Sequence, residues 1–348
     1  MNHSPNQFLI TGASGWVGRR LVEYIHTPLY DGLPIDSRVR CLVMTEQEAI
    51  PLRNLGDRIE VVVGDLRDPS TSARFCEDAD DAVLIHTAGV IHPARVSDFD
   101  DVNVKGSTNL LRAAVSGGIR RAVVISSNSP IGCNPSPEHL FDEESPYNPY
   151  QGYGRSKMLL EQMVHRFREE GQIETVILRP PWFYGPWQPP RQTLFFKMIR
   201  TGKMPIVGSG ENRRSMVYVD NLCQGIVRAA LCPQAAGKTY WIADSRPYTM
   251  NEIVGTVKRL LETEFGLPTS HKRLQLPSLV GDLAGVADSA LQKAGVYHQK
   301  IHVLSEMNKT IACSTKKAEK EIGYKPDVAL EEGMRRSISW CLEQGFAI

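Results

Sequence analysis

The sequence of 348 residues is 42% hydrophobic and 23% charged, and 40 basic side chains against 39 acidic ones leave a formal net charge of +1. This length predicts about two domains, and the balanced charge gives no long-range field for nucleic acid or an anionic membrane, so nucleic-acid binding is not expected. No apolar run reaches the ~20 residues of a membrane span, and the N-terminus lacks a secretory pattern, so we expect a cytoplasmic protein. The cysteines form no C-x-x-C pair, so we expect no metal site.

The first predicted element is an apolar strand that begins at Phe8 and ends in a glycine turn. Gly12, Gly15 and Gly18 recur at three-residue spacing, and a helix is expected over 19–26. A dinucleotide pyrophosphate suits this unit, because glycine lets the backbone approach the phosphates while the helix N-terminus faces the anion. An ordinary strand-to-helix turn that contains three glycines is the alternative.

Strands and helices then alternate along the first half of the chain. Such alternation builds a parallel sheet with helices on both faces, in which ligands lie at the carboxyl ends of the strands. We therefore predict an α/β fold with a doubly wound parallel sheet of the Rossmann type. The expected strands cover 38–44, 59–63, 82–85, 121–126 and 173–178, and the expected helices begin at Asp68-Pro69 or cover 102–114 and 153–170.

Small or polar residues follow three of these strands, on the side where the dinucleotide is expected. Taken alone, Asp65 is equally well interpreted as a turn aspartate, and His86 as a hydrogen-bonded core histidine. Their recurrence after successive strands favours a ligand site. The three groups are Gly64-Asp65-Leu66, His86-Thr87-Ala88-Gly89 and Ser126-Ser127-Asn128.

Tyr153 and Lys157 stand four residues apart in a predicted helix, which places them on one face. A phenol with a pKa near ~10 is a poor base at neutral pH, but a nearby ammonium lowers that pKa. Tyr153 is therefore a candidate proton shuttle. A surface helix that happens to carry both residues is the alternative.

Together, these motifs resemble the short-chain dehydrogenase/reductases, specifically their extended, epimerase-like branch, over nearly the whole chain. The resemblance implies that Tyr153 is the general acid/base and that Lys157 holds the ribose hydroxyls and tunes Tyr153. It also implies that Ser127 orients the reacting oxygen, that Asn103 supports Lys157 through water, and that a homodimer is possible. The motifs that carry it are the glycine turn, Asp65, Asn103-Val104-Lys105-Gly106-Ser107, Ser126-Ser127, Tyr153-x-x-x-Lys157, Arg179-Pro180, Tyr184-Gly185-Pro186 and 217–222.

By the same resemblance, a larger set of residues would contact the dinucleotide. At the end of the second strand Met44 replaces the usual discriminating residue, while Glu46 and Glu48 make the neighbourhood unfavourable for an extra phosphate. We therefore expect NAD, with NADP left open. The expected contacts are Gly12, Ser14, Gly15, Trp16, Val17, Gly18, Asp65, Leu66, Thr87, Ala88, Gly89, Ser126, Tyr153, Lys157 and Pro180.

The substrate is expected to contact Ser127, Trp182, Phe183 and Tyr184. Trp182 stands where nucleotide-sugar relatives usually have Asn, which favours a hydrophobic substrate unless the ring only packs beneath the loop. The segment 276–326 is similar to 3β-hydroxysteroid and sterol-carboxylate dehydrogenases. The preferred hypothesis is an NAD(P)-dependent oxidoreductase that interconverts a secondary alcohol and a ketone on a steroid- or terpenoid-like small molecule.

Two other functions remain open, and the domain plan is common to all three. Arg213 and Arg214 stand where nucleotide-sugar relatives contact phosphate, so a nucleotide-sugar epimerase or dehydratase is the first alternative. A non-catalytic dinucleotide-sensing protein is the second.

We expect a dinucleotide-binding domain over 6–178 plus 214–245 and a smaller, discontinuous C-terminal substrate lobe over 179–213 plus 246–348. Within the substrate lobe, the segment 276–296 is expected either to cover the pocket or to touch a membrane surface. In the dinucleotide-binding domain, the segment 135–149 is expected to be a mobile loop.

Overall fold

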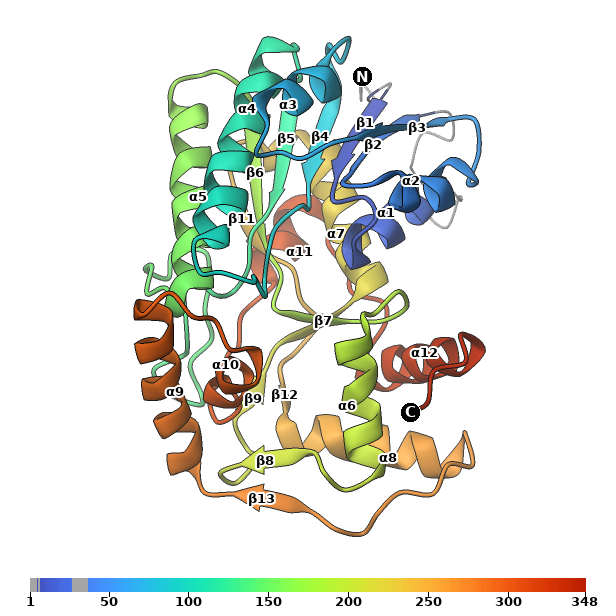
Figure 1. Cartoon of the computed structure of the whole chain (residues 1–348), viewed down its shortest axis with the longest axis vertical. Coiled ribbons are helices and arrows are strands. Elements are labelled where there is room, and N and C mark those ends of the chain that lie inside the picture. The colour runs from blue at the N-terminus through green and yellow to red at the C-terminus, as the bar shows by residue number, and fades with distance from the viewer. Residues whose placement is uncertain (1–4, 6, 27–36) are drawn as a thin grey trace.

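The computed structural model describes residue 5 and residues 7–26 and 37–348, and its centre is a parallel sheet of seven strands (Figure 1). The strand order is β11-β6-β5-β4-β1-β2-β3, so the order reverses between β1 and β4, where α/β proteins bind ligands. The predicted doubly wound α/β fold is confirmed. The strands are β1 Gln7–Thr11, β2 Arg38–Val43, β3 Ile59–Val63, β4 Val83–His86, β5 Arg121–Ile125, β6 Glu174–Arg179 and β11 Thr239–Trp241.

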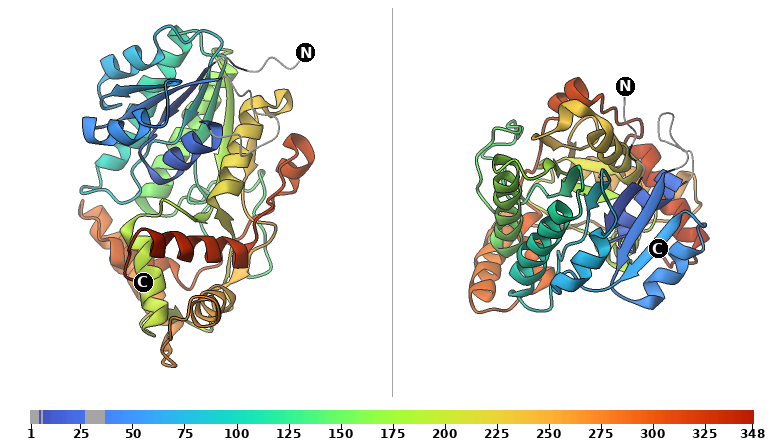
Figure 2. Two further views of the ribbon diagram at one scale, coloured as in Figure 1. Left: turned by 90° about the vertical axis from the view of Figure 1, so that its right-hand side faces the viewer. Right: turned by 90° about the horizontal axis from the view of Figure 1, so that it is seen from above.

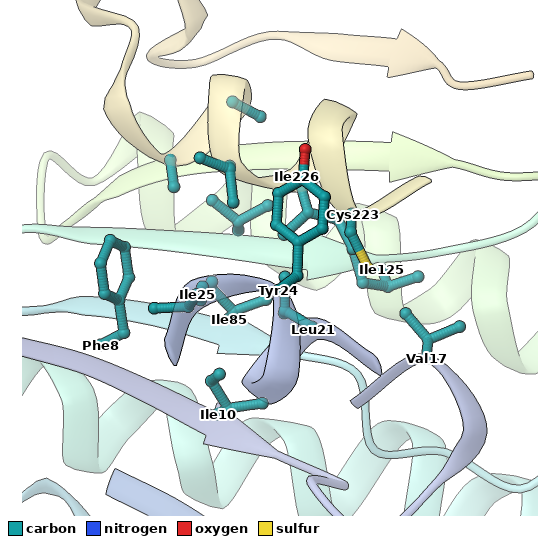
Figure 3. Close-up of a cluster of buried hydrophobic side chains, with 14 of the residues drawn as sticks. Phe8, Ile10, Val17, Leu21, Tyr24, Ile25, Ile85, Ile125, Cys223 and Ile226 are labelled. Carbon is teal, nitrogen blue, oxygen red and sulfur yellow. The ribbon is translucent and has the colours of Figure 1, made fainter. Parts of the chain in front are cut away.

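Helices cover both faces of this sheet. One face packs against α1 (Trp16–His26), α2 (Glu46–Arg53), α7 (Val219–Leu231) and α11 (Lys316–Ile322). The other packs against α3 (Pro69–Cys76), α4 (Ser107–Ser116) and α5 (Gln151–Glu169). Figure 3 shows the first of these cores, where Phe8 and Ile10 of β1 meet Leu21 of α1 and Ile226 of α7. Because β11 and α7 belong to this layer, the chain returns to the sheet after its first excursion into the second lobe.

The second lobe lies at the carboxyl ends of the strands, and its own strands have only two or three residues each (Figures 1 and 2). Its own core unites α6, α8 and α12 with the strands β7, β10 and β12. Among the described residues no helix is long and apolar enough to cross a membrane. The elements are β7 Trp182–Tyr184, α6 Pro190–Arg200, β8 Pro205–Val207, β9 Arg213–Arg214, β10 Met216–Tyr218, β12 Tyr248–Thr249, α8 Met250–Thr263, β13 Leu274–Leu276, α9 Ser278–Lys293, α10 Gln299–Glu306 and α12 Leu330–Glu343. A 3₁₀ turn, Pro233–Ala235, joins α7 to β11 and packs in the core of the seven-stranded sheet.

Three local features differ from the sequence prediction. The helix expected over 102–114 begins as a π-helix, Phe99–Gly106, and continues as α4. The helix α2 was not predicted, although Thr45 caps it and Glu48 closes a capping box. The segment 135–149 is not a free loop, because Phe141 N donates to Ala312 O at 2.8 Å and its ring stacks on Trp241.

Candidate active site

Two glycines of the turn between β1 and α1, Gly12 and Gly18, are packed too closely to carry a side chain. Gly12 has φ +65°, and a Cβ atom there would lie 2.9 Å from the backbone of Ala88. A Cβ on Gly18 would lie 2.1 Å from the carbonyl oxygen of Gly12. The first turn of α1 carries no acidic side chain, and its N–H groups have no partner within the helix. The turn therefore fits the pyrophosphate of a dinucleotide.

The residues after β4 lie beside this turn and are held by hydrogen bonds to Thr11 at the end of β1. Thr87 Oγ1 donates to Thr11 O at 2.7 Å, and Ala88 N donates to Thr11 Oγ1 at 3.2 Å. After β3, Asp65 accepts a hydrogen bond from Arg67 N at 2.9 Å, and the Arg67 guanidinium lowers the pKa of its carboxyl. Leu66 is buried, so only its backbone is available to a ligand.

His86 at the end of β4 is a core histidine and not a catalytic group. Its Nδ1 and Nε2 atoms lie 2.7 Å from Thr11 Oγ1 and from Ser107 Oγ. Since the Ser107 hydroxyl donates to Asn103 O, it accepts from Nε2–H, and Nδ1 accepts from Thr11. Burial lowers the pKa of His86 to about 3, so the ring is neutral.

Tyr153, Lys157 and Ser127 meet where β5 ends beside the first turns of α5. Tyr153 and Lys157 are buried, and Lys157 Nζ donates to Ile125 O at 2.9 Å. The hydroxyl of Ser127 is hydrogen-bonded to the phenol of Tyr153. Tyr153 and Lys157 are therefore buried on one face of α5, and the Ser127 hydroxyl lies at the Tyr153 phenol.

The protonation of this cluster differs from the sequence expectation. Burial raises the pKa of Tyr153 to about 12, and the hydrogen bond from Ser127 offsets part of that rise. Burial also lowers the pKa of Lys157 to about 8, while the charge of Glu161 raises it. The sequence analysis expected Lys157 to lower the pKa of Tyr153, but the influences on that pKa are desolvation and the charge of Glu306, which raise it, and Ser127, which lowers it. At neutral pH Tyr153 is protonated and able to donate, and Lys157 is mostly charged.

Asn103 lies in the π-helix, and both the oxygen and the nitrogen of its side-chain amide form hydrogen bonds. Its Oδ1 accepts from Val90 N at 2.7 Å, and its Nδ2 donates to Val90 O and to Ser156 Oγ, each at 3.0 Å. It forms no direct hydrogen bond with Lys157. A Cβ on Gly89 would lie 3.2 Å from Asn103 Oδ1 and 3.3 Å from Lys157 Nζ, so Gly89 separates the two polar groups.

A buried ion pair behind the cluster was missed by the sequence analysis. Glu161 of α5 is fully buried and pairs with Arg179 at 2.7 Å. Ser126 Oγ donates to Glu161 Oε1 at 2.5 Å, and Tyr147 OH donates to Oε2 at 2.9 Å. Ser126 thus supports Glu161 with its side chain. The signal was present, because Glu161 follows Lys157 by one further helical turn.

The three aromatic residues predicted to bind substrate have different environments. Trp182 is half-buried, with its ring 5.4 Å from Phe195 in a T-shaped arrangement. The Phe183 ring lies 4.6 Å from that of Trp16. Tyr184 is buried, and its hydroxyl donates to Asp244 at 2.8 Å. Trp182 and Phe183 remain candidates for ligand contact, whereas the hydroxyl of Tyr184 is already used in the core. Pro180 is buried at the end of β6.

The helices α9 and α10 form a further wall, and α9 lies within 276–296, which was expected either to cover the pocket or to touch a membrane surface. Gly152 N, at the start of α5, donates to Gln292 Oε1 at 3.0 Å. Glu306 of α10 is near enough for its charge to raise the pKa of Tyr153. The Phe99 ring lies 6.0 Å from that of Tyr153 and 5.8 Å from that of Tyr297. These contacts join residues far apart in the sequence.

Arg214 of β9 has a buried nitrogen atom that forms no hydrogen bond with any described residue. Its Nε atom has no hydrogen-bond partner there, and no described acidic side chain pairs with it. Arg214 and Glu306 both influence the pKa of Cys133, in the loop that follows Ser127. Arg214 therefore lies near the wall of the site that contains Tyr153.

Known proteins are similar to this chain over nearly its whole length. Protein y4nL of Sinorhizobium fredii is 52% identical over 341 residues, which cover 97% of this chain and 95% of the relative. The N-acetyl-alpha-D-glucosaminyl-diphospho-ditrans,octacis-undecaprenol 4-epimerase of Escherichia coli O157:H7 is 27% identical, covering 95% of this chain and 94% of the relative. The 3beta-hydroxysteroid-dehydrogenase/decarboxylase isoform 1 of Arabidopsis thaliana is 26% identical, covering 95% and 78%.

Among solved structures, the dTDP-glucose 4,6-dehydratase DesIV of Streptomyces venezuelae, with NAD and TYD bound, superimposes with a TM-score of 0.75. It is 25% identical, and the match covers 97% of each chain. The model of the NAD dependent epimerase/dehydratase family matches residues 8–243, which include the glycine turn, Ser127, Tyr153 and Lys157. The chain therefore belongs to the NAD dependent epimerase/dehydratase family, the extended branch of the short-chain dehydrogenase/reductases.

Proposed function

We propose that this protein uses NAD to interconvert a secondary alcohol and a ketone in its substrate, with Tyr153 as general acid/base. The observation that carries the proposal is the buried cluster of Tyr153, Lys157 and Ser127 beside the glycine turn. NAD, when bound, accepts a hydride from the substrate carbon or returns one. The acidic side chains Glu46 and Glu48 after β2 support NAD over NADP.

The side chains of the cluster divide the proton chemistry among them. Ser127 orients the substrate oxygen, and Tyr153, protonated at neutral pH, gives its proton to a ketone or takes one from an alcohol. Lys157 donates one N–H to Ile125 O and retains two for ribose hydroxyls. Its positive charge stabilises the phenolate form of Tyr153 during the reaction.

For the substrate, Arg214 supports a molecule that carries a diphosphate. A buried guanidinium N–H without an acceptor costs free energy, and a phosphate oxygen is the acceptor that arginine binds best. We therefore place a diphosphate-linked sugar first, as in an epimerase or dehydratase. The relative from Escherichia coli acts, by its name, on a sugar linked through a diphosphate to undecaprenol.

A hydrophobic alcohol is the second candidate, supported by a different observation. Trp182 and Phe183 present aromatic rings at the start of the second lobe, and Trp182 is only half-buried. Such rings favour an apolar substrate, as in the relative from Arabidopsis thaliana. A lipid-linked sugar diphosphate would satisfy both Arg214 and these rings.

The two candidates are separated by the fate of the cofactor. The purified protein is supplied with NAD and either sugar diphosphates or sterol-like alcohols, and NADH absorbance and sugar products are followed together. Sugar conversion without accumulation of NADH supports the first candidate, and net NADH with an alcohol supports the second. Arg214→Gln should raise KM for a diphosphate substrate, whereas Arg246→Gln, an exposed arginine paired with Glu252, should not. An unchanged KM in Arg214→Gln would contradict the first candidate.

A further inference from the structure

The helix α9, at the outer edge of the second lobe (Figure 1), has its polar side turned inward. The residues it buries include Gly281, Ala284, Asp288 and Gln292. The residues on its opposite face are apolar and exposed: Leu279 to 62%, Leu283 to 60% and Val286 to 71%. We call these three residues the α9 stripe. Their spacing of four and three residues places them on one side of the helix.

The orientation of α9 is fixed by hydrogen bonds of its buried polar residues. The carboxylate of Asp288 lies 2.8 Å from His302 Nδ1 and accepts two hydrogen bonds from Gln292, each 3.0 Å long. Gln292 in turn accepts from Gly152 N of α5. A rotation of α9 that buried the leucines would break these bonds and leave His302 Nδ1 and Gly152 N against apolar side chains without their hydrogen-bond partners. The exposure of the α9 stripe is therefore built into the fold.

The surroundings of the α9 stripe are basic. Lys272 and Arg273 precede it, Lys293 ends α9 and Lys300 begins α10, and all four are exposed. The one exposed acidic residue within α9, Asp282, is paired with Lys309 at 2.6 Å. The whole chain has a net charge of only +1, so this end of the second lobe is locally positive.

We propose that the α9 stripe docks on the surface of a bilayer that contains anionic lipids. Leucine and valine side chains on one helix face enter the boundary between head groups and acyl chains, while lysine and arginine beside them contact lipid phosphates. A second copy of the chain would bring the same basic residues against one another, which disfavours self-association through this face. The proposal does not depend on which substrate is used.

The test compares vesicle binding by the whole protein and by variants with exposed substitutions. In cosedimentation, vesicles of phosphatidylcholine with phosphatidylglycerol should bind the protein, and vesicles of phosphatidylcholine alone should bind it more weakly. The double variant Leu279→Ser/Leu283→Ser should lose about tenfold or more in partition coefficient. Lys272→Gln/Arg273→Gln should lose binding only to the anionic vesicles.

The matched control is Ile50→Ser on α2, because Ile50 is 56% exposed on a different surface. It should bind vesicles as the natural protein does, and thermal unfolding should confirm that every variant folds. Absence of binding to anionic vesicles, or equal binding by the double serine variant, would overturn the proposal. A dimer that dissociates in the double serine variant without any vesicle binding would also overturn it, because the occupant would then be a second copy.

Discussion

Replacing Glu161 with Gln tests whether the buried ion pair controls the lysine of the active site. The change leaves the guanidinium of Arg179 buried without its charge partner, and breaking a buried pair costs ~3–5 kcal/mol. Gln retains the volume and one oxygen, so we expect the lower end, about 3 kcal/mol. That loss corresponds to a fall in Tm of about 4 °C for a chain of this size.

The same change should move the titration of Lys157. Its pKa is about 8, and the carboxylate of Glu161 raises it, so removal of that charge must lower it further. A unit charge ~6 Å away at an effective dielectric constant of ~20 contributes roughly 3 kcal/mol, or about two pKa units. Because Arg179 offsets part of this charge, we expect a drop of about one unit.

Two measurements check both parts. Thermal unfolding reports the stability, and NMR of isotope-labelled lysine reports the pKa of Lys157, with the alkaline limb of activity expected to shift to lower pH. Glu169→Gln is the matched control, since Glu169 ends the same helix and is exposed. A Lys157 titration in Glu161→Gln that matches the natural protein, together with an unchanged Tm, would refute the reasoning.

Two further predictions concern the glycine turn and α9. Gly18→Ala places a Cβ 2.1 Å from Gly12 O and should abolish NADH binding in a fluorescence titration. Gly255→Ala in α8, where a Cβ would meet nothing within 4 Å, should raise the free energy of unfolding in denaturant by ~0.5–1 kcal/mol. Tight binding by Gly18→Ala would contradict the placement of the pyrophosphate. The partnership of His302 with Asp288 and Glu306 holds the pKa of His302 above its usual value, so its stabilising contribution is complete below the unfolded pKa of ~6.5 and is lost as pH rises through the folded value. His302→Gln should remove that part of the pH dependence of unfolding, and an unaltered pH profile would contradict it.

The sheet could be predicted from the sequence because its strands are short apolar runs that end at turn residues. The third strand was placed at the residues that the structure has, Ile59–Val63, and the order of strand ends brought Ser127 beside Tyr153 and Lys157. Tyr153 and Lys157 are four residues apart on one helix, so their proximity is a local property. The glycine turn is partly local, because Gly18 packs on Gly12 within one strand–turn–helix unit, whereas Gly12 itself packs on Ala88 after β4.

The remainder of the site depends on contacts that the sequence pattern does not encode. The pKa of Tyr153 follows from its burial and from the charge of Glu306, which no spacing rule reports. The wall formed by α9 and α10 depends on contacts such as the hydrogen bond from Gly152 N to Gln292, which are 140 positions apart in the sequence. Over the eight residues of the π-helix around Asn103, the apolar spacing cannot be distinguished from that of an α-helix. Tertiary contacts decide which of the two helix types forms.

The central claim is that Tyr153 moves the proton during alcohol–ketone interconversion, and Tyr153→Phe tests it most directly. The substitution removes the hydroxyl that is bonded to Ser127 and leaves the buried ring, which lies 6.0 Å from that of Phe99. Turnover of the substrate identified by the cofactor assay should fall by a factor of about 10²–10⁴ while NAD affinity, measured by calorimetry, stays within about twofold. Activity equal to that of the natural protein, with NAD bound normally, would contradict the account.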